Sequence, residues 1–77
     1  METAASVSCV EGIGATAGVV WRTLSDNGPM TVARLVKAVD EPRDRVMQAI
    51  GWLAREGKLD ISESHRGHLI SLRENGR

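Results

Sequence analysis

The chain has 77 residues, 42% of them hydrophobic, which is enough for one small folded domain. Lysine plus arginine and aspartate plus glutamate number ten each, so the zero net charge excludes indiscriminate coating of DNA or of acidic membranes. The single cysteine, Cys9, excludes an internal disulfide and a cysteine zinc cluster, so we expect a cytoplasmic domain held by packing alone, with no metal and no cofactor.

Residues 1–10 are mostly small and polar, and we expect a flexible N-terminal tail there. They lack the basic segment and the apolar run of a signal peptide, and no segment approaches the roughly 20 apolar residues that a membrane span requires. We therefore predict a folded domain over residues 11–73, a C-terminal tail over residues 74–77, and no membrane partner.

The first apolar pattern after this tail has the spacing of an α-helix. Its members are Ile13, Ala17, Val20, Trp21 and Leu24. We predict a first helix with Trp21 in the core. Three glycines, at positions 12, 14 and 18, weaken its start by up to about 1 kcal/mol each relative to alanine, and Asn27-Gly28-Pro29 ends it.

Two further helices are predicted on either side of a tight turn. Met30 and Thr31 form a short extended piece, and Thr31 is a good N-cap for a helix that continues to Val39. In a capping box, an acidic side chain at position 34 would accept a hydrogen bond from the backbone N–H of Thr31, but this position holds Arg34. The helix therefore starts with one capping hydrogen bond fewer. A third helix runs from about Pro42 to Glu56 and packs its apolar side inward.

After Lys58 the spacing of apolar residues changes from about four to two. Leu59 and Ile61 alternate with polar residues, as do Ile70 and Leu72. A polar loop that includes Gly67 connects the two runs, which predicts an antiparallel hairpin.

Three helices, a short strand between the first two, and a hairpin after the third give the order of an α+β winged helix-turn-helix domain, a three-helix bundle with a C-terminal β-hairpin wing. The chain closely resembles a family of small prokaryotic winged helix-turn-helix proteins of unknown function in two strings, GPMTV at residues 28–32 and AIGWLAREGKL at residues 49–59. This resemblance covers residues 11–72. Related winged helices are mostly DNA-binding transcription regulators, so the resemblance implies DNA binding and transcription regulation.

The third helix is the predicted recognition helix. On a helical wheel, Arg45, Gln48, Trp52 and Arg55 lie together, nearly opposite the apolar stripe. Arginine can pair with guanine and glutamine with adenine in the major groove, although an ordinary solvated face has the same composition. The candidate DNA-binding residues, including the helix ends and the wing that would contact the DNA backbone, are Arg43, Arg45, Gln48, Arg55, Lys58 and Arg66.

Trp52 supports a second hypothesis. A bulky ring opposite the core stripe needs a cover, and we favour the wing or the N-terminal segment as that cover. Alternatively, Trp52 and Gln48 bind a protein partner or a second copy of the chain. The alternative function is therefore a protein–protein interaction winged helix with little or no affinity for DNA.

Catalysis and metal binding are not expected. His65 and His68 are three residues apart on a hairpin, a spacing that suits metal binding on a helix better, and no acidic or cysteine cluster joins them. Cys9 has no neighbouring base to activate it. We therefore predict that the protein is not an enzyme, and that its partners are double-stranded DNA, a second copy or another protein.

Overall fold

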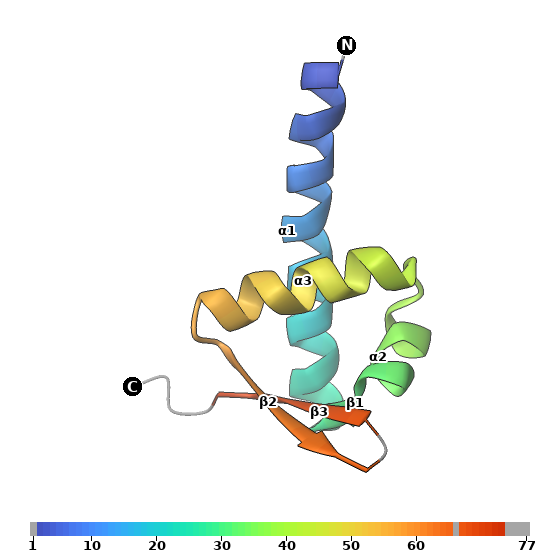
Figure 1. Ribbon diagram of the computed structural model, residues 1–77, viewed down its shortest axis with the longest axis vertical. Coiled ribbons are helices and arrows are strands. Elements are labelled where there is room, and N and C mark those ends of the chain that lie inside the picture. Colours follow the sequence, from blue (N-terminus) through green and yellow to red (C-terminus); the bar gives the residue numbers. More distant parts are fainter. Residues whose placement is uncertain (1, 66, 74–77) are drawn as a thin grey trace.

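The computed structural model describes residues 2–65 and 67–73, with side chains from Cys9 onward. The elements, in chain order, are α1 (Glu2–Asn27), β1 (Met30–Thr31), α2 (Val32–Val39), α3 (Arg43–Arg55), β2 (Leu59–Ser64) and β3 (Gly67–Leu72). Figure 1 shows α3 crossing α1, with α2 beside them and the sheet at the end of the bundle where α1 ends. This architecture confirms the predicted α+β winged helix-turn-helix fold.

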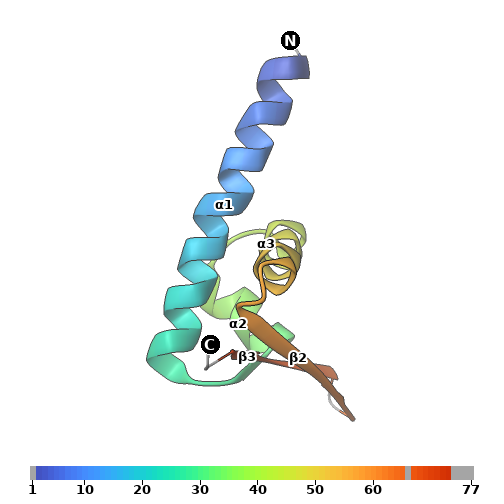
Figure 2. The ribbon, with the colours of Figure 1, turned by 90° about the vertical axis from the view of Figure 1, so that its left-hand side faces the viewer.

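Helix α1 is longer than predicted. We expected a tail up to residue 10, but helical structure begins at Glu2, and the N-terminal turns stand clear of the other elements in both views (Figures 1 and 2). This segment contains no glycine or proline before Gly12, and its alanines are strong helix formers. The domain boundary at residue 11 stays a prediction, and the predicted tail at residues 74–77 lies outside the described residues.

The turns follow the local signals of the sequence. Gly28 has a φ of 81° immediately after α1, and Gly57 has a φ of 74° after α3, a region that residues with a side chain rarely adopt. The Thr31 hydroxyl accepts a hydrogen bond from the backbone N–H of Arg34 at 3.3 Å, which confirms Thr31 as the N-cap of α2. Pro42 is the cap residue of α3 and not its first residue.

The sheet has three antiparallel strands in the order β1-β3-β2. Ile70 in the central strand lies opposite both Met30 and Ile61, and it is only 1% exposed. Strands β2 and β3 form the predicted hairpin, which projects away from α1 (Figure 2). Ile70 therefore joins this wing to the core.

The core consists of one cluster of buried side chains from all three helices and from the hairpin. Its members are Ala17, Val20, Leu24, Val32, Leu35, Val39, Val46, Ala49, Ile50, Leu53, Leu59 and Ile70. The prediction that Trp21 belongs to this core is wrong, since Trp21 is 44% exposed. At about 100° per residue, Trp21 lies about 70° from the centre of the buried stripe of α1, beyond the arc that α2 and α3 cover.

Candidate nucleic-acid interface

Helix α3 buries Val46, Ala49, Ile50 and Leu53 and leaves a flank on each side of this stripe. The wing flank carries Arg43 and Met47, and the α1 flank carries Arg45 and Trp52. The two flanks have different neighbours, and this difference decides which side of the helix is open to a long partner.

The wing flank borders a hollow of about 180 Å³. Three segments that are distant in the sequence meet there, namely the start of α2, the first turns of α3 and the start of β3. The lining residues are Thr31, Val32, Ala33, Arg43, Met47, Gly67 and His68. The arrangement places the candidate recognition helix, the helix before it and the wing around one depression.

The start of α2 adds backbone polarity to this hollow. The first N–H groups of a helix have no partner within the helix, and the Thr31 cap takes up that of Arg34. The first turn of α2, all of which the structure describes, contains no acidic residue. The positive end of the helix dipole is therefore not offset by an acidic residue on α2 itself, which favours an anion such as a phosphate group.

Acidic side chains lie close to several basic side chains of the hairpin. His68 Nε2 lies 3.6 Å from Glu63 Oε2, and Arg73 Nε lies 3.8 Å from Asp60 Oδ1. The candidate Lys58 Nζ lies 3.7 Å from Glu56 Oε1. All of these groups are exposed, so the pairs contribute little to stability, but they reduce the positive field around the wing.

The α1 flank is partly covered. A Cβ added to Gly12 of α1 would overlap the guanidinium group of Arg45, which is half-buried. A Cβ added to Gly14 would lie 3.8 Å from Trp52. The expected single free stripe is therefore divided, because α1 passes over Arg45 at Gly12 and beside Trp52 at Gly14. Trp52 lies beside α1 on this side and stays 36% exposed, so the expected cover is only partial.

The remaining candidates lie at different places. Gln48 and Arg55 are exposed on the outward side of α3, whereas Arg66 lies outside the described residues. Sequence reasoning missed Met47 and considered His68 only as a metal ligand, although both line the hollow. The spacing of four between Arg43 and Met47 was the available signal for Met47, since residues four apart share a helix face.

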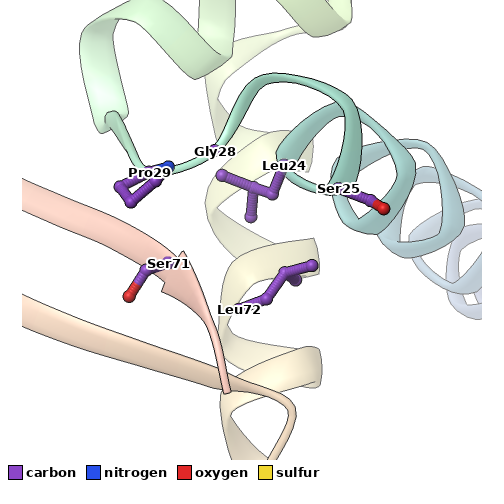
Figure 3. Close-up of a pocket in the computed structure, with 6 residues that line it drawn as sticks. All are labelled: Leu24, Ser25, Gly28, Pro29, Ser71 and Leu72. Atoms are coloured by element: carbon purple, nitrogen blue, oxygen red, sulfur yellow. The ribbon is translucent and has the colours of Figure 1, made fainter. Parts of the chain in front are cut away.

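A second hollow, of about 500 Å³, lies between the end of α1 and the end of β3 (Figure 3). Its lining residues are Leu24, Ser25, Gly28, Pro29, Ser71 and Leu72. None of these lining side chains is ionisable, so this hollow offers no charged group to a nucleic acid. Elsewhere in the described part of the chain, no group of three or more metal-binding side chains is present, and no described helix is long and apolar enough to span a bilayer.

Comparisons with known proteins agree with the winged helix-turn-helix fold. The structure of protein BT2368 from Bacteroides thetaiotaomicron, determined by NMR in solution, is 31% identical, with 80% of this chain and 76% of that chain covered and a TM-score of 0.73. The structure of BpsR from Bordetella bronchiseptica, whose DNA binding is regulated by 6-hydroxynicotinic acid, is 30% identical, with 82% of this chain covered and a TM-score of 0.73.

The match covers 46% of BpsR, so this chain corresponds to less than half of that protein. No curated protein matches the chain. The model of one family, described as the winged helix-turn-helix domain (DUF2582), matches residues 2–72. The chain therefore belongs to the DUF2582 family of winged helix-turn-helix domains.

Proposed function

We propose that this protein is a DNA-binding module of a transcription regulator and that it binds double-stranded DNA with the wing flank of α3. One observation carries the proposal: Arg43, the start of α2 and the start of β3 line the same hollow. A duplex is a long, convex partner, and it needs several elements to present donors on one side of the protein.

The chemistry of the hollow suits a phosphate backbone beside a groove. Arg43 is exposed and can donate two parallel hydrogen bonds to a phosphate or to guanine O6 and N7. The N-terminus of α2 supplies backbone donors without a competing acid in its first turn. In this proposal Gln48 and Arg55 face the major groove, while Arg66 contacts the backbone from the turn of the wing.

One comparison fits this role, and the charge of the chain limits how affinity for DNA could arise. BpsR, a structural neighbour at 30% identity, is a protein whose DNA binding is regulated. The chain also carries no net charge, so its affinity for DNA has to come from local placement of donors and not from a general positive field. The proposed role is binding, not catalysis.

The test is a fluorescence anisotropy titration with duplex DNA at low and moderate salt. The unmodified protein should bind more weakly as salt rises, because phosphate contacts release counterions. Arg43→Gln should weaken binding and reduce the salt slope by about 1, as expected for one lost phosphate contact. The matched control, Arg45→Gln, changes the same residue type on the covered flank and should leave both quantities nearly unchanged.

An unmodified protein that shows no binding at low salt, or binding without salt dependence, would contradict the proposal. Equal losses in the two variants would contradict the assignment to the wing flank. The partly exposed Trp52 favours a second candidate function, a protein-interaction domain with little affinity for DNA. This alternative predicts that the unmodified protein shows no binding at low salt, or binding without salt dependence.

A further inference from the structure

A groove of about 370 Å³ runs between α1 and the end of α3, on the side of α3 opposite the wing flank. Gly14 and Gly18 of α1 line it together with the rings of Trp21 and Trp52. Its rim near the start of the wing carries one acid and one base, Glu56 and Lys58.

The two tryptophans are the only aromatic residues of the Phe, Trp and Tyr class in the chain, and both remain partly exposed, at 44% for Trp21 and 36% for Trp52. Each therefore leaves a substantial part of a large apolar residue open to water. Val10, three turns before Trp21 on the same side of α1, is also exposed. Val10 therefore adds a separate exposed apolar group on this side of α1, beyond the groove.

The glycines of the groove are not required by the packing of the monomer. A Cβ added to Gly18 would meet no atom within 4 Å, and one added to Gly14 would make only ordinary contact with Trp52. Glycine disfavours a helix relative to alanine, and one physical reason to keep it in a helix is close approach of another group to the backbone. The approaching group at Gly18 would come from outside the monomer.

We propose that this groove is a self-association surface, in which a second copy of the chain packs its Trp21 against the exposed backbone at Gly18 in a twofold arrangement. A twofold interface needs protruding and recessed groups on one patch, and this patch has the indole of Trp21 directly beside the bare helix surface. One patch therefore supplies both halves of the contact.

Charge favours the same occupant. Glu56 and Lys58 form an ion pair within the chain at 3.7 Å, so this rim carries no net charge that would repel the same rim of a second copy. The whole chain has no net charge that would keep two copies apart. A strongly charged partner would find no complementary field on this patch.

The area predicts a weak dimer. Each copy contributes two partly exposed tryptophans and Val10, so we expect the buried area to stay below the roughly 1,200 Å² of standard stable interfaces. We expect association at micromolar concentrations or above. The wing flanks of both copies stay open, so this proposal is independent of whether the protein binds DNA.

The test is sedimentation equilibrium of the full chain, without DNA, from low micromolar to millimolar concentration. The apparent mass should rise from that of one copy, 8.3 kDa, towards that of two. Trp21→Ala should weaken association at least about tenfold. Val19→Ala, which removes an exposed apolar side chain from another face of α1, is the matched control and should leave association unchanged.

Gly18→Ala separates association from folding. The added methyl has room in the monomer and favours the helix, so the midpoint of denaturant unfolding should rise while the association constant falls. A protein that stays monomeric at millimolar concentration would overturn the proposal. Equal weakening by Trp21→Ala and Val19→Ala, or unchanged association in Gly18→Ala, would also overturn it.

Discussion

The two flanks of α3 are similar in composition and different in surroundings. Each carries an arginine and a bulky apolar residue, Arg43 with Met47 on the wing flank and Arg45 with Trp52 on the α1 flank. The wing flank opens towards two other elements, whereas α1 passes over Arg45 and beside Trp52. Residue type alone therefore does not identify a DNA-binding face, because the path of a neighbouring helix decides which arginine is accessible.

The difference also suggests a division of roles. The wing flank has the shape and the donors for an extended anionic partner. The α1 flank has exposed aromatic rings that suit the apolar surface of a second copy of the chain. In our account DNA and a second copy of the chain therefore occupy opposite sides of one helix.

The largest effect is expected at the residue that joins the wing to the core. Ile70→Ala should lower the free energy of unfolding by about 2–5 kcal/mol, because the buried side chain leaves a cavity under the central strand. Leu69→Ala, at the next position on the opposite face of β3, should cost about 1 kcal/mol or less. Urea unfolding of both variants measures the difference, and equal losses would mean that the wing is not held by Ile70.

The connection between α3 and the wing depends on a left-handed backbone at Gly57, where φ is 74°. Gly57→Ala should destabilise the protein by about 1–2 kcal/mol, since a side chain is strained in that region. Gly51→Ala within α3, where an added Cβ meets no atom within 4 Å, should instead stabilise it by about 0.5–1 kcal/mol. Thermal unfolding tests these opposite signs, and a shift of the same sign in both would contradict the account.

Removing the N-cap of α2 tests how this helix contributes to the hollow beside the wing flank. Thr31→Ala should cost about 1 kcal/mol of stability, because the backbone N–H of Arg34 loses its acceptor. DNA affinity should fall as well, since the frayed turn borders the hollow. Thr31→Ser keeps the hydroxyl and should retain both properties, so an equally weakened serine variant would show that capping is not the cause.

The smallest effect is expected where α1 meets Arg45. Gly12→Ala forces the end of this flexible side chain to move but improves the helix, so stability should change by no more than about 0.5 kcal/mol. The side-chain N–H resonance of Arg45 should nevertheless shift in an NMR spectrum. An unchanged resonance would show that α1 does not cover this flank.

Much of the fold was predictable because its signals are local. The Thr31 cap, the glycines after α1 and α3, and the alternation of Leu59 and Ile61 with polar residues each depend on neighbours within a few residues. The start of α1 was missed because a run of small and polar residues is typical of a flexible tail. The alanines in the same run, however, strongly favour a helix. Trp21 was misplaced because helical spacing gives the direction of a side chain but not the width of the arc that neighbours cover.

The candidate site was harder to predict for the same reason. The sequence indicated α3 as the recognition helix and placed Arg45, Gln48 and Arg55 on one side of it, which is correct for an isolated helix. The hollow, however, combines Arg43 with the start of α2 and with β3, and only the packing of three elements brings them together. The periodicity of one helix does not show which residues of other elements pack beside it.

The most direct test of the central claim, that DNA binds the wing flank, is a nitrogen-15 NMR titration with duplex DNA at fixed protein concentration. We predict that the backbone signals of Arg43, Met47 and His68 shift with added DNA, while the indole signals of Trp21 and Trp52 stay in place. Shifts centred on Arg45 and Trp52, with the wing flank unchanged, would contradict the account.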